Sequence, residues 1–333
     1  MRRALALLAC ALCGPLAAAE APPVVERMIE AARTLNYRGH VVQMEGTQAQ
    51  TFDLLHRAGN EAGEDRVHSL QGAYWELHRA GSQCRIAFTD VRPAHDEAIV
   101  AAAFPSLVPT RLVRLAEFYD FVPVGSGRLA GRAVDFTLAR PRDEFRFAHL
   151  FATDTDTGLL VKAGLLDHHG QVLRQVFFVD LRLIPILSDI EWRARPATVP
   201  ARLEWTERRL HPAPATTELP WSIGALPAGF GVSGYGRRRM PGGDQEVEQV
   251  TVSDGLVSVS VFIDTQAPAN AGLLGARRIA TMPVYGAAVA GRHVTVLGAA
   301  PFAALRQIAA AVGPAPSSAP APATLTSTPE PIR

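Results

Sequence analysis

The fold of this chain is decided by residues 134–183, VDFTLARPRDEFRFAHLFATDTDTGLLVKAGLLDHHGQVLRQVFFVDLRL, in which short runs alternate apolar with polar side chains. The first run, Val134–Ala139, has a period of two, which is the pattern of a β-strand with one buried face. Turn residues at Asp154–Gly158 and Asp167–Gly170 separate successive runs by only a few positions. Because parallel strands need a crossover of about a dozen residues, these strands are predicted to pair antiparallel.

One face of this sheet carries several aromatic side chains and therefore needs a cover. Phe145, Phe147 and Phe151 recur at strand spacing, and we interpret them as core side chains on one face of a single strand. An open acyl-binding surface is the alternative. The amphipathic segment Val24–Leu35, predicted to be the first helix, and the segment Ala98–Tyr119 are the expected covers.

Further runs extend the same sheet. Four strand-like runs follow the first helix: Tyr37–Met44, Thr51–His56, Tyr74–Arg79 and Cys84–Thr89. Gly125–Gly127 is predicted to be a turn. In the last run, Val172–Leu183, the alternation predicts that Phe177 and Val179 share a face with Leu181. The large domain is predicted to span residues 20–208.

A smaller unit follows a change in composition. The Pro-, Ala- and Thr-containing segment 209–217 is predicted to be a linker, and residues 218–313 a second domain. Asp254-Gly255, between the runs Glu246–Val252 and Leu256–Asp264, predicts a β-hairpin. A final helix is predicted to begin at Pro301 and to end near Gly313, and residues 314–333 are predicted to be a disordered tail.

The first nineteen residues have the three-part pattern of a secretory signal peptide. Arg2 and Arg3 precede an apolar stretch, and cleavage is predicted after Ala19. A lipoprotein signal ending at Cys10 is the alternative. Cleavage after Ala19 leaves Cys84 as the single cysteine of the mature chain, so we predict a buried thiol and no internal disulfide.

Charge and motif spacing argue against several functions. The chain has 33 Lys and Arg against 32 Asp and Glu, and this near-zero net charge argues against nucleic acid as a partner. Gly229–Gly234 matches the dinucleotide-binding pattern, but no helix is predicted after it to hold a pyrophosphate. Asp154–Gly158 lacks the spacing of a calcium loop, and His168-His169 is predicted to be a loop tip. We therefore predict no cofactor and no metal.

No pattern in the sequence indicates catalysis, since no nucleophile elbow or metal-ligand spacing occurs in the mature chain. The one cationic run is Arg237-Arg238-Arg239. We interpret it as a solvated turn, with contact to a carboxylate-bearing partner or to a lipid phosphate as the alternative, because guanidinium groups bind both in a bidentate manner.

Several short motifs occur in an order that resembles one family, the MucB/RseB regulators. They are Leu35-Asn36-Tyr37-Arg38-Gly39, Phe104-Pro105-Ser106-Leu107, Phe118-Tyr119-Asp120-Phe121, Asp156-Thr157-Gly158-Leu159-Leu160, Leu226-Pro227-Ala228-Gly229-Phe230, Ser253-Asp254-Gly255-Leu256 and Val259-Ser260-Val261-Phe262. The resemblance covers residues 24–313. Two features depart from the family's pattern: Ala299-Ala300 stands where relatives usually carry a Gly-Glu pair, and the tail from Pro314 looks like an extension.

The resemblance implies an α+β fold. The large domain would be a curved antiparallel half-barrel similar to LolA and LppX, covered by helices, and the small C-terminal domain a mixed α/β module. The family resemblance also implies a periplasmic negative regulator of a sigma-E or AlgU-type envelope-stress sigma factor. Such a protein would bind the periplasmic region of an RseA/MucA-like anti-sigma factor and shield it from the site-1 protease, and lipid or lipopolysaccharide-derived signals would release it.

The sequence is compatible with three functions to different degrees. A non-catalytic regulator fits best, and a periplasmic lipid or lipoprotein carrier is the main alternative, although a carrier has no evident need of residues 218–313. A secreted hydrolase would require a catalytic cluster that the sequence does not show. The hairpin Glu246–Asp264 is expected to offer an edge to a partner strand, with Arg237–Arg239 and the phenylalanine stripe as further contact candidates. The sequence leaves the oligomeric state open, a homo-oligomer included.

Overall fold

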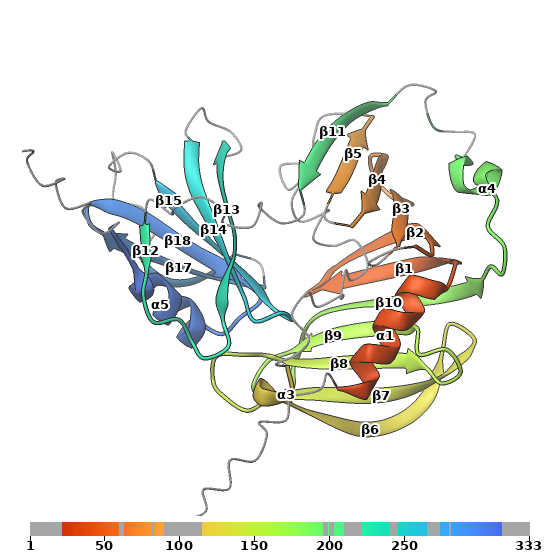
Figure 1. Ribbon diagram of the computed structural model, residues 1–333, viewed down its shortest axis with the longest axis horizontal. Helices are drawn as coiled ribbons and strands as arrows, with labels where there is room; N and C mark the ends of the chain where they lie inside the picture. Colours follow the sequence, from red (N-terminus) through yellow and green to blue (C-terminus); the bar gives the residue numbers. More distant parts are fainter. Residues whose placement is uncertain are drawn as a thin grey trace, which may run out of the picture.

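The computed structural model describes residues 22–59, 63–81, 83–89, 115–195, 199, 203–209, 221–239, 246–264, 274–279 and 281–314. These residues form a large and a small antiparallel sheet, each with its own hydrophobic core (Figure 1). The predicted leader, the linker 209–217 except Arg209, and the tail beyond Pro314 lie outside the described residues, as do residues 98–114 of the predicted cover.

The large sheet has eleven strands in the order β11-β5-β4-β3-β2-β1-β10-β9-β8-β7-β6. The strands are β1 (Tyr37–Glu45), β2 (Gln48–Arg57), β3 (Glu64–Ser69), β4 (Trp75–Ala80), β5 (Gln83–Phe88), β6 (Tyr119–Leu129), β7 (Arg132–Pro141), β8 (Ala148–Asp154), β9 (Leu160–Leu166), β10 (Val172–Leu183) and β11 (Glu204–Arg209). Each neighbouring pair is antiparallel, as predicted. The sheet curves strongly, so that β3, β4, β5 and β11 turn away from β6–β10 (Figure 1).

The first helix, α1 (Pro23–Thr34), confirms the amphipathic segment and lies across the large sheet (Figure 1). Its side chains Val25, Met28 and Ala31 are buried in the same core as Phe52 and Phe151. Pro23 stands at the start of the helix, where its missing N–H costs no intrahelical hydrogen bond. Two short helices follow: α3 (Leu115–Phe118) leads into β6, and α4 (Asp189–Arg193) begins at a Ser188 capping box.

The predicted face of β10 is wrong at its centre. The pairing of β1 with β10 shifts register between His40 and Val41, which leaves Val179 as an extra residue. As a result Phe178 is buried in the core, whereas Val179 is 51% exposed. Leu181 still packs against the core. It follows the bulge in the chain, and only the residues before the bulge point to the face opposite to the predicted one.

Two further predictions on the large sheet need correction, and one strand was missed. Gly125–Gly127 is not a turn but lies within β6, and the chain reverses at Ala130-Gly131, both in the left-handed region. The strand expected to contain Phe145 and Phe147 begins only at Ala148. Strand β3 was not predicted at all, because its alternation is formed mainly by polar side chains that are buried through ion pairs.

The small sheet has six strands in the order β13-β14-β15-β18-β17-β16. They are β13 (Gly231–Arg239), β14 (Glu246–Ser253), β15 (Ser258–Asp264), β16 (Gly275–Ile279), β17 (Met282–Val289) and β18 (Arg292–Gly298). The β14–β15 hairpin confirms the Asp-Gly prediction. Helix α5 (Phe302–Ala311) packs against β17 and β18. It ends two residues before Gly313, which instead lies in β19 (Val312–Pro314), paired with β12 (Trp221–Ile223).

Candidate functional site at the junction of the two sheets

The predicted contact residues do not gather at one place. Arg237–Arg239 form the end of β13, an outermost strand of the small sheet, and are therefore not a turn. Arg237 is exposed, with its guanidinium 3.6 Å from Oε1 of Glu248. Strands β14 and β15 both have neighbours on each side, so the hairpin Glu246–Asp264 does not supply the open edge that we expected; β13 does.

The phenylalanine stripe is divided between the two cores. Phe151 is fully buried in the large core, whereas Phe145 packs against the small one. Phe147 is also buried, and its ring centroid lies 5.6 Å from that of His168. The stripe is divided because residues 143–147 form the connection from β7 to β8, where the alternation of a strand no longer applies.

Arg146, between two of these phenylalanines, is the centre of the junction. Its side chain is fully buried, and its Nε donates to Oδ2 of Asp254 at 2.7 Å. Its Nη2 donates to the carbonyl oxygen of Ala228 at 2.6 Å, and its Nη1 pairs with Asp143. Each of the three guanidinium nitrogens therefore has an acceptor, as a charged group inside a protein requires.

Aromatic rings from both sheets enclose the Arg146 guanidinium. Its central carbon lies 4.4 Å from the ring centroid of Phe118 and 4.7 Å from that of Phe230. Phe118 ends α3 and packs against the core of the large sheet, whereas Phe230 belongs to the core of the small one. The arginine is therefore stacked between the two domains, where a cation–π contact gains strength from the exclusion of water.

Asp254 has two roles at the same position. Its Oδ1 accepts hydrogen bonds from the backbone N–H groups of Leu256 and Val257, at 2.9 and 2.8 Å, and so forms the β14–β15 turn. Its Oδ2 accepts from Arg146 and from the hydroxyl of Tyr119, the latter at 3.3 Å. Burial, together with the Asp254 carboxylate, raises the pKa of Tyr119 well above its usual value, so this hydroxyl stays a donor.

Gly229 explains why a dinucleotide-like pattern occurs here. Its φ is +81°, and a Cβ atom built on it would lie 2.3 Å from Cε2 of Phe118. A side chain is therefore excluded by backbone conformation and by space at once. The glycine allows the 226–230 segment to approach Phe118 closely.

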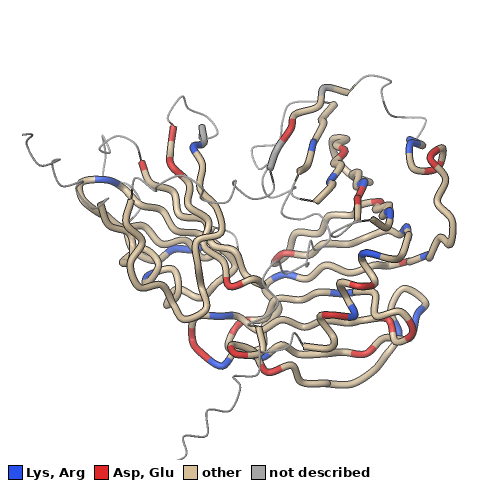
Figure 2. Tube along the Cα trace, viewed as in Figure 1, with Lys and Arg blue, Asp and Glu red and all other residues tan. Residues whose placement is uncertain are grey.

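Two smaller contacts extend the junction. Leu256, on the turn of the small sheet, packs against the core of the large one. At the far end of β1, the Thr281 hydroxyl donates to Oε1 of Glu45. Acidic and basic residues are otherwise mixed over both sheets (Figure 2), in agreement with the net charge of +1.

Neither charged residue of the junction was predicted to be buried. Asp254 was interpreted only as a turn residue, and Arg146 was not singled out at all. The available signal was weak: a charged residue flanked closely by Phe145 and Phe147, which is rare on a solvated turn.

The other candidate sites have structural explanations. Asp154, the first residue of the pattern that resembles a calcium loop, is buried. Its carboxylate accepts hydrogen bonds from Arg132 and Thr157 in the turn between β8 and β9. His168 and His169 lie in the turn between β9 and β10, as predicted. Within the described ranges, no three His, Cys, Asp or Glu side chains are placed to hold a metal ion, and no helix is long and apolar enough to cross a membrane.

His149 makes the stability of the large domain depend on pH. Its Nε2 is inaccessible to solvent and lacks a hydrogen-bond partner in the described chain, and burial lowers its pKa from 6.5 to about 4. As the pH falls from 6.5, the unfolded chain binds a proton at this histidine before the folded chain does. We expect the free energy of unfolding to fall by about 2–3 kcal/mol between pH 6.5 and 4 from this group.

Denaturant unfolding of the wild type and of His149→Phe over this pH range measures that contribution. The free energy of unfolding of the wild type should fall steadily relative to that of the variant as the pH falls, because only the wild type carries the titrating group. A difference that stays constant with pH would contradict the assignment.

The fold and the junction define a class: a two-domain protein in which a curved antiparallel sheet is joined, through a buried arginine–aspartate pair, to a smaller sheet backed by one helix. The chain belongs to the MucB/RseB family. Residues 20–196 match the family's N-terminal domain and residues 215–313 its C-terminal domain.

Individual relatives agree with this assignment. The sigma factor AlgU regulatory protein MucB of Pseudomonas aeruginosa is 28% identical over 308 residues, covering 89% of this chain and 92% of that protein. The sigma-E factor regulatory protein RseB of Haemophilus influenzae is 24% identical and covers 85% of this chain and 88% of that protein. The crystal structure of MucB in complex with MucA(peri) superposes with a TM-score of 0.68 at 25% identity, covering 89% of this chain and 99% of that one.

Proposed function

We propose that this chain is a periplasmic regulatory binding protein that binds the periplasmic region of an RseA/MucA-like anti-sigma factor. It protects that region from site-1 proteolysis and releases it in response to lipid or lipopolysaccharide-derived signals. The match over both domains to MucB solved in complex with MucA(peri) carries this proposal. The function needs affinity and no reacting group, so the chain acts as a binding protein and not as an enzyme.

The outer edge of β13 is the contact surface that we assign to the partner. An outermost strand presents unpaired backbone groups to which an extended peptide can add as a further strand. β13 also ends in the run Arg237–Arg239, and the exposed guanidinium of Arg237 would pair with a carboxylate of that peptide. On the opposite edge of the small sheet, β16 carries Arg277, which provides a matched control.

The test is capture of the periplasmic segment of the anti-sigma factor from the same organism by residues 20–333. The wild type should retain the segment and slow its cleavage by the site-1 protease. Arg237→Glu/Arg238→Glu/Arg239→Glu should weaken capture by about tenfold or more, because like charges then face the partner's carboxylates.

Arg277→Glu, on the opposite edge, should bind like the wild type. Equal loss in both variants would move the contact away from β13. Recovery of only lipid or lipoproteins from a periplasmic and membrane extract would overturn the regulator function in favour of a carrier.

A further inference from the structure

A second polar cluster lies on the large sheet, on the face opposite to the core. Along β3, β4 and β5, the side chains of Val67, Leu77 and Ile86 are buried in the core. Successive residues of a strand point to opposite faces, so the neighbouring Arg66, His78 and Arg85 point away from it. Arg66 lies opposite His78, and His78 opposite Arg85, so the three side chains form one row across three strands.

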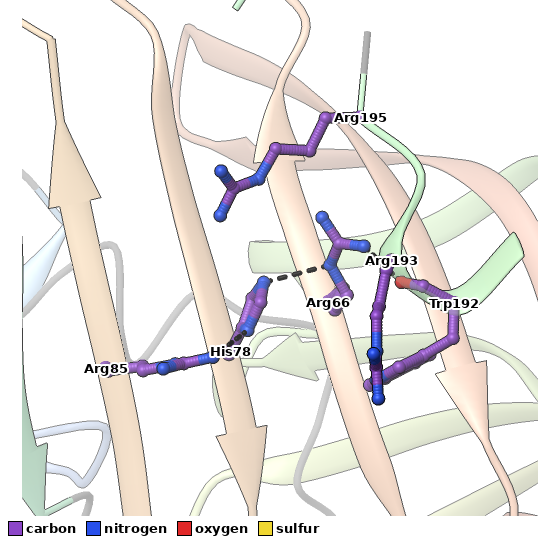
Figure 3. Close-up of a pocket in the computed structure, with 6 residues that line it drawn as sticks. All are labelled: Arg66, His78, Arg85, Trp192, Arg193 and Arg195. Carbon is purple, nitrogen blue, oxygen red and sulfur yellow. Dashed lines mark hydrogen bonds between the residues drawn. The ribbon is translucent and has the colours of Figure 1, made fainter. Parts of the chain in front are cut away.

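This row forms one wall of a pocket of about 410 Å³, a volume within the range of small-molecule sites. Its lining residues are Arg66, His78, Arg85, Trp192, Arg193 and Arg195 (Figure 3). Arg66 and Trp192 are buried and form the floor, whereas Arg85, Arg193 and Arg195 are exposed and form the rim. The lining thus contains four guanidinium groups and no carboxylate.

Two nearby carboxylates balance only part of this charge. Glu76 is buried and pairs with both Arg66, at 2.6 Å, and Arg195, at 3.1 Å. Although burial opposes ionisation, hydrogen bonds from His78 and Arg66 lower the pKa of Glu76 to about 2, so this carboxylate is charged. Glu207 lies opposite Arg85 across β5 and β11.

Arg193 completes the excess of positive charge. Among the described residues, its guanidinium has no hydrogen bond and no ion pair to another residue, and its side chain is exposed. The His78 ring adds no charge at neutral pH, because burial lowers its pKa. Four guanidinium groups beside two carboxylates leave the pocket with an excess of two positive charges.

Aromatic stacking holds the rim arginines in place. The guanidinium carbons of Arg85 and Arg195 lie 4.8 and 5.6 Å from the ring centroid of Trp205, and the His78 ring lies 4.7 Å from the same tryptophan. Guanidinium groups fixed before the ligand arrives lose less conformational entropy when they bind it.

We propose that this pocket binds a phosphate-monoester dianion. Arg85, Arg193 and Arg195 would donate hydrogen bonds to it, and the buried Arg66 would form the floor of the site. A dianion matches the excess of two positive charges, and the planar fork of a guanidinium matches two phosphate oxygens. The pocket lies on the large sheet and β13 on the small one, so this inference stands independently of the anti-sigma contact.

Isothermal titration of residues 20–333 with inorganic phosphate, at an ionic strength held constant with sodium chloride, tests the site. The wild type should show saturable binding. Arg193→Ala and Arg85→Ala should each weaken it by about tenfold or more, as expected for the loss of one charged hydrogen-bonding group. Arg193 has no partner to lose, so its variant should keep the wild-type circular dichroism spectrum and melting temperature. Arg277→Ala, an exposed arginine of the small sheet, should bind phosphate like the wild type.

Two results would overturn the proposal: phosphate that binds no better than chloride at matched ionic strength, or an Arg85→Ala/Arg193→Ala variant that binds phosphate as the wild type does. Phosphatidylcholine vesicles with and without phosphatidic acid then distinguish the source of the phosphate. Arg193-dependent retention on the acidic vesicles identifies a lipid headgroup. Binding of free phosphate without such retention identifies a soluble phosphate ester.

Discussion

Replacing Asp254 with alanine is expected to lower the free energy of unfolding by about 3–5 kcal/mol, the usual cost of removing one partner of a buried ion pair. Arg146 is fully buried and would keep only Asp143 as an acidic partner, on the solvent side of the junction. The two backbone N–H groups of the β14–β15 turn would lose their acceptor as well. Denaturant unfolding measures the loss, and calorimetry should show the two domains melting as separate transitions.

A set of variants separates the ion pair from the turn. Asp254→Asn keeps an oxygen for the turn and removes the charge, so it should lose less stability than alanine does. Arg146→Met leaves Asp254 buried and unpaired, and the double variant Arg146→Met/Asp254→Asn should recover part of the loss, because the two effects are coupled. Strict additivity of the two single changes would show that the pair does not join the domains.

The second large effect is expected from Phe151→Ala, which should cost about 3–5 kcal/mol through the cavity left in the large core. Phe151 is completely inaccessible to solvent and packs in the same core as Leu77 and Phe178. Phe145→Ala should cost less, since its side chain is only partly buried at the edge of the small core. Denaturant midpoints of the two variants provide the comparison.

This pair of variants also tests the acyl-binding alternative for the phenylalanine stripe. If Phe151 is a core residue, its replacement lowers stability and any binding of fatty acid falls only as the protein unfolds. A stable Phe151→Ala variant with impaired fatty-acid binding would instead show that the stripe lines a lipid site.

Alternation of apolar residues predicted most of the large sheet, because the tight turns after Asp154 and Asp167 left antiparallel pairing as the only choice. It failed where another force replaced hydrophobic burial. In β3, Asp65 is buried by its bonds to His56 and Arg79, and Arg66 by its bond to Glu76. A strand whose buried side chains are ionic has no apolar period for a pattern search to detect.

The buried face of β10 was predicted wrongly, and the junction was not predicted, for a different reason. Both depend on contacts between residues that are distant in sequence. The bulge at Val179 is a property of the pairing with β1, about 140 positions earlier in the chain, and no local pattern encodes it. Arg146 and Asp254 are separated by 108 positions. Each is compatible with a solvated turn when considered alone, and only their contact shows that both are buried.

The junction is formed by connections within each sheet: Asp143–Phe147 between β7 and β8, the 226–230 segment before β13, and the Asp254 turn between β14 and β15. Each of these contacts joins a residue before position 209 to a residue after position 221. In this respect the two domains meet as the subunits of a heterodimer do. A chain cut between residues 210 and 220 would keep every contact named here, and its two fragments would be able to reassociate as separately made subunits.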